Sequence, residues 1–307
     1  MSERDIIDLK SAFAIYQDPG FLEILARCGN MSVLDLGGLL LLAKERPILG
    51  YMRILLGGPE NFGPFDLWWK KAEELSFSYL NIQTSIECPS LESYLISPKD
   101  NYSMIVDLRV GKENLIKTFS KNKRRNIRRA MKQNVVIRDP ENDTELEEAY
   151  QICLKTSQQG ELFDVPSFNF VNNLVRSNYG KAAIAVYDGT VVGGVFFILG
   201  HKIMSGLVGG YDREYGHLNV GNLLHYQMMC WGISSGYEFY DMGHQSLSQN
   251  PNLTQSKMQF RPKLKPAYVY NIPKSRTKII LTDTVKYLSE RFVKSFANLD
   301  SHVSFLS

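Results

Sequence analysis

Apolar residues recur at helix and strand spacings through the first 110 residues. After the turn at Asp18-Pro19-Gly20, Phe21, Leu22, Leu25 and Ala26 recur at helical spacing, which predicts a short amphipathic helix. Residues 32–57 form short apolar runs broken by Gly-Gly and by a polar turn, a pattern typical of a strand meander. A Gly/Pro loop at 57–65, a helix at 66–77 and a strand at 78–86 complete a mixed α/β unit.

The order of elements repeats in the second half. Residues 111–133 form one continuous helical pattern, which predicts a long helix that bridges the halves, with one stripe at intervals of four: Leu115, Phe119, Lys123, Ile127 and Met131. Strands within 182–210 follow, joined by a hairpin turn at Asp188-Gly189, then a helix at 222–235 and a strand at 238–243.

These patterns predict an α/β fold with mixed sheets, built as two domains joined by a long basic helix. We assign residues 1–110 to the first domain, 111–134 to the linking helix and 135–275 to the second domain, which carries the active cleft. Residues 276–307 are expected to form a C-terminal amphipathic helix and tail. We expect that helix to pack on the body, with a partner or peripheral membrane contact as the alternative.

Composition is that of an ordinary folded protein. The 307 residues are 44% hydrophobic and 22% charged, which excludes global disorder. No apolar run is long enough for a transmembrane helix and no leader is recognisable, so we expect a cytoplasmic protein. The isolated cysteines fit a reducing compartment and lack zinc-ligand spacing, so no metal site is expected; they are Cys28, Cys88, Cys153 and Cys230.

The segment 121–132 concentrates positive charge. It holds seven basic residues and no acidic one, although the net charge of the chain is only +3, so the remainder sums to 3 − 7 = −4. A solvent-facing basic helix can follow a phosphate backbone without reading sequence. The candidate nucleic-acid-binding residues are Lys121, Lys123, Arg124, Arg125, Arg128, Arg129 and Lys132.

One other interpretation of this segment is open, and a second is disfavoured. The acidic block Asp139 to Glu148 carries six acidic residues and could neutralise the basic helix from the side. A leucine-zipper arm would continue into heptads, whereas Pro140 and the acidic block interrupt the pattern, so no DNA partner is expected.

A second motif bears on phosphate binding. Arg213-x-x-Gly216 begins like the R-x-x-G-x-G/A loop with which acetyltransferases hold the pyrophosphate of coenzyme A on a helix N-terminus. Leu218 stands where the second small residue belongs, so we expect weak coenzyme A binding. The sequence has neither a P-loop nor a G-x-S-x-G elbow, so hydrolase and nucleotide-phosphate chemistry have no support.

Several segments, in this order, resemble those of Fem-type aminoacyltransferases and related acyltransferases with tandem GNAT-like domains. They are YQDPGFLEIL, GGPENFGPF, SKNKRRNIRRA, NVGNLLHY, YEFYDMG and SKMQF. The resemblance implies two GNAT-like domains and transfer of an aminoacyl group from charged tRNA to the peptide of a cell-wall precursor. Relatives use acyl-thioesters. No bound cofactor is implied.

The resemblance also implies roles for single residues. Lys257 occupies the lysine position of the K-x-x-F element, where it would stabilise the oxyanion of the tetrahedral intermediate. Asp241, in the D-x-G strand motif, would position or deprotonate the amine, although a buried structural aspartate is an equal alternative. Gln159 stands near the place where many members have an arginine for an anionic acceptor. The residues expected to contact substrate are Tyr211, Arg213, His244, Gln159 and Arg261.

The sequence therefore favours an acyltransferase, with charged tRNA as donor and an amine of a peptide or cell-envelope precursor as acceptor. The alternative is an N-acyltransferase that uses acyl-coenzyme A or acyl carrier protein on a sugar or lipid. A non-catalytic RNA-binding protein would need only the basic helix.

Overall fold

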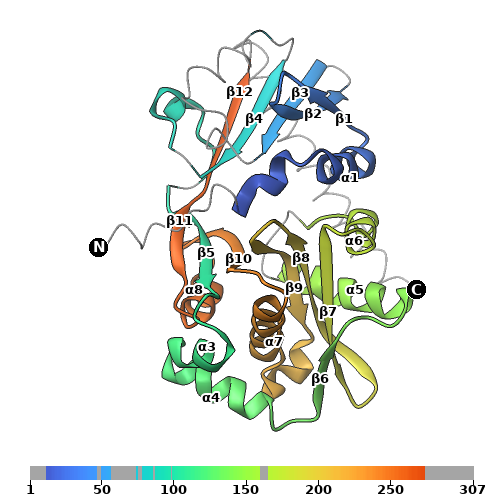
Figure 1. Ribbon diagram of the computed structural model, residues 1–307, viewed down its shortest axis with the longest axis vertical. Helices are drawn as coiled ribbons and strands as arrows, with labels where there is room; N and C mark the ends of the chain where they lie inside the picture. Colours follow the sequence, from blue (N-terminus) through green and yellow to red (C-terminus); the bar gives the residue numbers. More distant parts are fainter. Residues whose placement is uncertain are drawn as a thin grey trace, which may run out of the picture.

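The protein forms two mixed sheets, one above the other along its longest axis (Figure 1). This computed structural model describes residues 12–46, 50–56, 74, 78–85, 87–97, 99–159 and 165–273. The expected α/β class with mixed sheets is confirmed. The predicted loop at 57–65, nearly all of the helix at 66–77 and the C-terminal helix lie outside the described residues.

The first sheet has the strand order β1-β2-β3-β4-β12. A 3₁₀ helix, η2 (Ala12–Gln17), and α1 (Pro19–Gly29) precede it, so the first predicted helix is confirmed. The Asp18 carboxylate caps α1 by accepting the N–H of Phe21, and Pro19 stands at its first position. The remaining elements are β1 (Ser32–Asp35), β2 (Leu40–Arg46), β3 (Gly50–Leu56), β4 (Tyr79–Thr84), η4 (Pro89–Tyr94) and β12 (Tyr268–Pro273).

The second sheet has the order β11-β5-β10-β9-β8-β7-β6. The Asp188-Gly189 hairpin is confirmed between β7 and β8, because both residues have the positive φ that such a turn requires. The strands are β5 (Asn101–Asp107), β6 (Val135–Arg138), β7 (Gly180–Tyr187), β8 (Thr190–Leu199), β9 (Ile203–Tyr211), β10 (Phe239–Ser246) and β11 (Lys263–Pro266). The helices are α3 (Lys112–Thr118), α4 (Lys121–Ala130), α5 (Asp143–Gln159), α6 (Phe168–Val175), η5 (Arg213–Leu218), α7 (Val220–Ser234) and α8 (Pro251–Met258).

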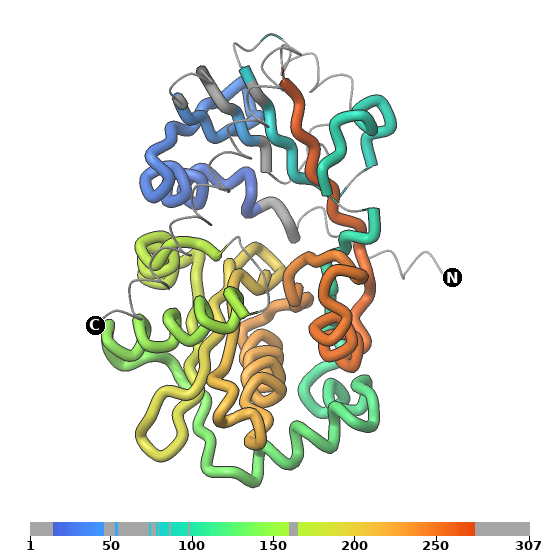
Figure 2. The backbone as a smooth tube through the Cα atoms, turned by 180° about the vertical axis from the view of Figure 1, so that it is seen from behind, coloured from blue at the N-terminus to red at the C-terminus, as the bar shows by residue number. Residues whose placement is uncertain are grey.

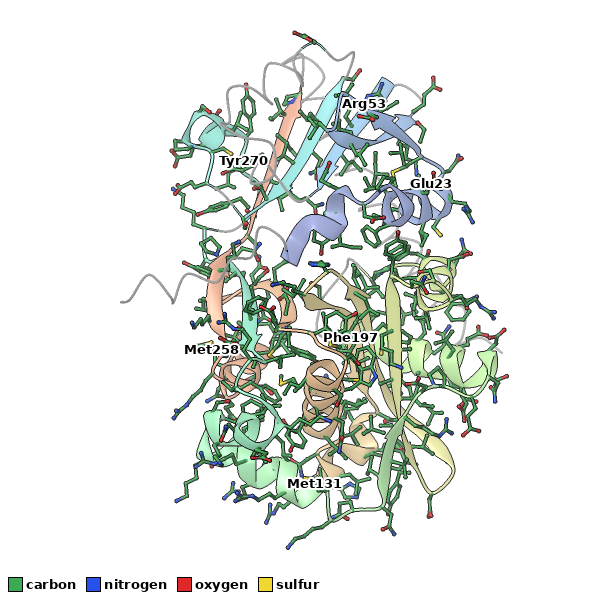
Figure 3. All side chains as sticks on the ribbon, viewed as in Figure 1. Glu23, Arg53, Met131, Phe197, Met258 and Tyr270 are labelled. Atoms are coloured by element: carbon green, nitrogen blue, oxygen red, sulfur yellow. The ribbon has the colours of Figure 1, made fainter. Side chains whose placement is uncertain are left out.

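Helices cover both faces of the second sheet. On one face α7 packs with α3 and α4 over a core that includes Phe119, Ile127 and Phe197 (Figure 3). On the other face α5 and α6 enclose a separate core around Ala149 and Phe196, and these two helices face the reader in Figure 2. Apolar burial on both faces makes this half a three-layer structure, with the sheet between two sets of helices.

The two sheets share one pairing pattern. In the first, β1, β2 and β3 are antiparallel neighbours, β4 pairs with β3 in parallel, and antiparallel β12 follows. In the second, β7, β8 and β9 are antiparallel neighbours, β10 pairs with β9 in parallel, and antiparallel β5 follows. This likeness supports the expectation that the two halves superpose, which stays a prediction.

The prediction of one long helix at 111–133 is wrong. The helical pattern is interrupted at Phe119 and Ser120, where α3 ends and the Ser120 hydroxyl caps α4 by accepting the N–H of Lys123. Leu115, Phe119 and Ile127 are buried against α7, so these helices belong to the second body and do not bridge the halves. Met131, expected on the same stripe, is 54% exposed.

Sheet membership also crosses the expected boundaries. β5 lies before residue 111 yet pairs with β10 and β11 in the second sheet. β12 lies near the end of the described chain yet pairs with β4 along six residues in the first sheet (Figure 1). Each sheet is therefore completed by a strand from outside its own assigned range.

The α1 helix and its cap pack on the second body. Phe21 shares a core with Phe170 and Leu174 of α6, and the Tyr179 hydroxyl donates a 2.6 Å hydrogen bond to the Asp18 carboxylate. The cap of α1 is thus also a contact between the halves.

Candidate functional site

The parallel strands β9 and β10 part in the middle of the second sheet. They pair only from Ile203 and Phe239 to Ser205 and Asp241; beyond this point β9 stays with β8, while β10 bulges and continues along β5. Gly243 lies in the bulge with φ of 80°, a conformation that suits glycine. We call the point where the strands part, after Ser205 and Asp241, the strand fork.

Asp241 is buried at the fork. The residue is only 4% exposed, and its carboxylate accepts a hydrogen bond from the Gly243 N–H at 2.9 Å. Burial raises the pKa of Asp241 to about 6, against the lowering effects of the Gly243 hydrogen bond and of the charges on Lys257 and Lys265. A carboxyl group that ionises near pH 6 suits proton transfer at neutral pH.

Lys257 reaches the same place from α8. Asn250 caps that helix and Pro251 opens it, so that Lys257 falls in the last turn. Its ammonium donates a 2.7 Å hydrogen bond to the carbonyl oxygen of Met242, the residue after Asp241. The residue is only half-buried as a whole, but desolvation of its ammonium lowers the pKa of Lys257 to about 8, and the Asp241 charge opposes this shift. The structure therefore brings together the two residues predicted to be catalytic.

The first half adds a tyrosine that the sequence did not single out. Tyr16 lies on η2. Burial is the main cause that raises its pKa, and the charge of Asp241 raises it further, whereas a hydrogen bond with Ser205 lowers it. Tyr16 therefore stays protonated beside the fork. The only sequence signal was that Tyr16 begins the motif YQDPGFLEIL, whose residues carry no spacing that points to Asp241.

The predicted substrate-binding residues fall into two groups. His244 is exposed on β10 just beyond Asp241, where desolvation and then the Lys257 charge lower its pKa, and Arg261 is exposed shortly after α8. Tyr211 lies six residues beyond Ser205 along β9, roughly 20 Å at the usual rise of a strand. Arg213 is exposed and lies two residues after Tyr211. Gln159 is the last residue of α5, and the Thr156 hydroxyl of the same helix donates a hydrogen bond to the Tyr211 carbonyl oxygen. Tyr211 and Arg213 are thus not brought to the fork.

Lys123 does not belong to the exposed basic surface, and its assignment to nucleic-acid binding is wrong. It is only 2% exposed, because it sits on the inner stripe of α4. Its ammonium donates to the side-chain oxygen of Asn222 at 2.6 Å and to the Ser256 hydroxyl at 3.4 Å, and it lies 4.2 Å from the centre of the Phe260 ring. Burial lowers its pKa to about 8.

His225 connects this buried lysine with the fork. Its Nδ1 lies 2.7 Å from the hydroxyl of Tyr240, the residue before Asp241. Burial, then the charges of Lys257 and Lys123, lower the pKa of His225 to about 3, so the ring is neutral near pH 7. A neutral, enclosed histidine with a tyrosine partner is a structural element of the site and not its proton carrier.

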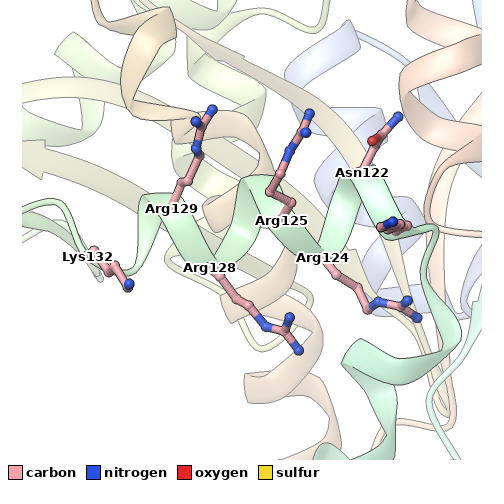
Figure 4. A pocket seen from close by; sticks show the side chains of 7 residues that line it. Asn122, Arg124, Arg125, Arg128, Arg129 and Lys132 are labelled. Atoms are coloured by element: carbon pink, nitrogen blue, oxygen red, sulfur yellow. The ribbon is translucent and has the colours of Figure 1, made fainter.

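The outer face of α4 is an exposed basic surface (Figure 4). Its side chains line a shallow hollow of about 490 Å³ and extend from both sides of the helix. Arg124 is half-buried and caps α3, donating to the carbonyl oxygens of Lys117 and Phe119 at 3.1 and 3.2 Å. The residues that we define as the basic face are Lys121, Arg125, Arg128, Arg129 and Lys132, all exposed.

The acidic block does not neutralise this face. Among the residues that the structure describes, none of the ion pairs joins the block to α4. Four of its six carboxylates are engaged elsewhere: Arg138 pairs with Glu141 and Glu145, Arg176 with Asp143, and Lys181 with Asp139. The basic face is therefore open to an external anion.

The start of α7 is covered by an aromatic ring. A Cβ atom built on Gly221, in the first turn, would lie 3.1 Å from the ring of Tyr211. The Asn219 side chain makes no capping bond to the helix N–H groups, and Leu218 is buried. The Tyr211 ring therefore lies beside the first turn of α7, next to the amides on which a pyrophosphate would bind.

The described ranges contain neither a candidate metal site nor a candidate membrane-spanning helix. Within them, no three His, Cys, Asp or Glu side chains gather closely enough to hold a metal ion. None of the helices described there combines the length and apolar character needed to cross a bilayer.

Residues 117–248 match the family model described as an acetyltransferase (GNAT) domain. This range contains the strand fork and Asp241. Over this range the protein is similar to GNAT acetyltransferases, and this likeness supports an acyltransferase. Lys257 lies beyond the matched range, on the helix that follows it.

Solved structures share the fold of the whole chain. FemX superposes with a TM-score of 0.66 at 12% identity, covering 86% of this chain and 95% of its own. The C-terminal domain of a protein named as a lysylphosphatidylglycerol synthetase from Agrobacterium fabrum gives 0.59 at 17% identity, covering 90% and 95%. L-PGS from Bacillus licheniformis gives 0.52 at 18%, covering 87% and 96%. No curated protein matches by sequence.

At these identities the likeness concerns the fold. It confirms the resemblance to Fem-type proteins that the ordered motifs indicated, because FemX matches across both bodies and not only across the GNAT domain.

Proposed function

We propose that this acyltransferase moves an aminoacyl group from charged tRNA to an amine of a peptide or cell-envelope precursor. The observation that carries the proposal is the juxtaposition of Asp241 and Lys257 at the strand fork. One is a carboxylate able to take a proton near neutral pH, and the other is an ammonium able to face a developing oxyanion.

The chemistry needs no covalent enzyme intermediate. Ionised Asp241 removes a proton from the acceptor ammonium, and the freed amine nitrogen forms a bond to the donor carbonyl carbon. The carbonyl electron pair moves to oxygen, and the Lys257 ammonium stabilises that charge. When the intermediate collapses, the bond to the donor oxygen breaks, and the leaving tRNA oxygen takes the proton held by Asp241. The nitrogen then releases its remaining excess proton to the ionised Asp241, which passes it to solvent, and a neutral amide results. One such cationic donor lowers the barrier by about 3 kcal/mol.

The basic face supports tRNA as the donor. It carries five exposed cations without carboxylate partners among the described residues, and contacts with several phosphates would give strong, salt-dependent affinity. The name of one structural neighbour refers to an aminoacylated lipid, lysylphosphatidylglycerol, which is consistent with aminoacyl transfer on this fold. The covered first turn of α7 disfavours coenzyme A.

The test is mass spectrometry of products after incubation with charged tRNA, acyl-thioesters and amine acceptors, with Lys257→Ala as control. We expect acceptor mass to rise by one aminoacyl group with charged tRNA alone. Full turnover with acyl-thioester and no RNA would establish the alternative N-acyltransferase. Binding of tRNA without any product would establish a non-catalytic RNA-binding protein.

A further inference from the structure

The helix that carries Lys257 has little apolar anchorage. None of the eight residues of α8 is buried. Polar contacts hold it instead: the Asn250 cap, a 2.6 Å hydrogen bond from the Gln245 amide to the Thr254 hydroxyl, and the bond from Lys257 to Met242. The aim of the Lys257 ammonium therefore depends on what fixes the last turn of α8.

Lys123 contacts the chain on both sides of Lys257. Its ammonium donates to the hydroxyl of Ser256, the preceding residue, and lies over the ring of Phe260, three residues later. Its shortest hydrogen bond, at 2.6 Å, goes to the side-chain oxygen of Asn222 in the first turn of α7. One buried side chain thus ties the last turn of α8 to the helix behind the fork.

Stability does not account for a lysine here. Its hydrogen-bond partners are neutral, so among the residues that the structure describes its charge is buried without a carboxylate partner, and burial lowers its pKa to about 8. An apolar side chain of similar length would fill this space without the cost of desolvating an ammonium. What an apolar side chain cannot supply is directed hydrogen bonds to Asn222 and Ser256.

We propose that Lys123 is a positioning residue for Lys257. It holds α8 against α7 through Ser256 and Phe260, so that the Lys257 ammonium faces the carbonyl oxygen of the bound donor. The backbone supports the same register, because the Ser120 N–H at the start of α4 donates to the Gln259 carbonyl at 2.9 Å. This inference rests on the proposed function, in which Lys257 stabilises the oxyanion.

The test compares Lys123→Met, Ser256→Ala and Lys257→Ala, with Lys117→Met as the matched control on the exposed surface of α3. We expect Lys123→Met to keep the melting temperature and the KM for the donor while kcat falls between about tenfold and a hundredfold, the cost of a small misplacement. Ser256→Ala should lower kcat less, and should add nothing further in the Lys123→Met background.

The two hypotheses fail separately. If the wild-type protein forms no product with charged tRNA, the proposed function is wrong; if it does and Lys257→Ala turns over normally, Lys257 has no part in the mechanism and the positioning role of Lys123 is wrong. If Lys257→Ala is impaired but Lys123→Met has the kcat of Lys117→Met, or changes only the KM, the positioning role is wrong. If Lys123→Met unfolds, Ser256→Ala decides, since a normal kcat in that variant overturns the inference.

Discussion

Lys257 and Asp241 act on each other's ionisation while the lysine ammonium bonds the carbonyl of Met242. The positive charge favours the ionised carboxylate, and the negative charge favours the protonated amine, but burial of both groups outweighs this attraction. The pKa of Asp241 is raised to about 6 and that of Lys257 is lowered to about 8. The form with both groups charged therefore dominates only between these values.

The first prediction concerns pH. The rate should rise as Asp241 loses its proton near pH 6 and fall as Lys257 loses its proton near pH 8, so kcat/KM should be bell-shaped with a maximum near pH 7. Asp241→Asn should abolish the rise in kcat/KM near pH 6, because that rise depends on ionisation of Asp241. A rate that keeps rising above pH 9 would contradict the requirement for a protonated Lys257.

The second prediction concerns Lys257→Ala. Loss of about 3 kcal/mol of transition-state stabilisation corresponds to a decrease in kcat on the order of a hundredfold, with little change in donor binding. Single-turnover kinetics with charged tRNA measure this step directly. A thermal melt serves as the control, because α8 has no buried residue and the variant should keep its fold. Unchanged turnover would remove Lys257 from the mechanism.

The third prediction concerns the basic face. If its five cations contact phosphates, the log-log dependence of tRNA affinity on salt should have a slope of about −3 to −4, at ~0.7 per phosphate. Reversing Arg125, Arg128 and Arg129 to Glu should remove most of that slope together with activity.

Arg124 provides the contrast within the same helix. Because it caps α3, Arg124→Glu should lower the melting temperature more than the surface reversals do. If the triple reversal still works with charged tRNA, α4 is not the tRNA contact.

The fourth prediction concerns coenzyme A. The wild-type protein should bind it weakly, because the Tyr211 ring lies against Gly221 at the start of α7. Tyr211→Ala should expose the first-turn amides and tighten binding, which isothermal titration can measure. Equal, tight binding by both proteins would show that the ring is no obstacle and would favour the thioester alternative.

Local patterns predicted most elements of the fold. The Asp18 cap, the Asp188-Gly189 turn and the strand alternation are decided by neighbours in sequence, so they could be read directly. The break between α3 and α4 could not, because the residues around Phe119 and Ser120 are compatible with a continuous helix. Tertiary packing decides it, since Phe119 must reach the Phe260 ring at 5.1 Å.

The position of Lys123 in the sequence and its charge favoured different predictions. Its position at intervals of four with Leu115, Phe119 and Ile127 placed it on the inner stripe, but its charge grouped it with the basic face. Only the positions of Asn222 and Ser256, some 100 and 130 residues away, show why a lysine can be buried there. Tyr16 was missed for the same reason, because its partners come from β9 and β10.

The exchange of strands between the two sheets sets an order on folding during synthesis. A ribosome releases β1 to β4 first, but the partner that covers the outer edge of β4 is β12, which emerges almost 190 residues later (84 to 268). Until then β4 has unpaired N–H and C=O groups along one edge, a surface prone to wrong pairing. The second sheet pairs β5 with β10 (239–246) about 20 residues earlier, but its edge strand β11 (263–266) emerges directly before β12. Both sheets therefore become complete only when the last described strands have left the ribosome.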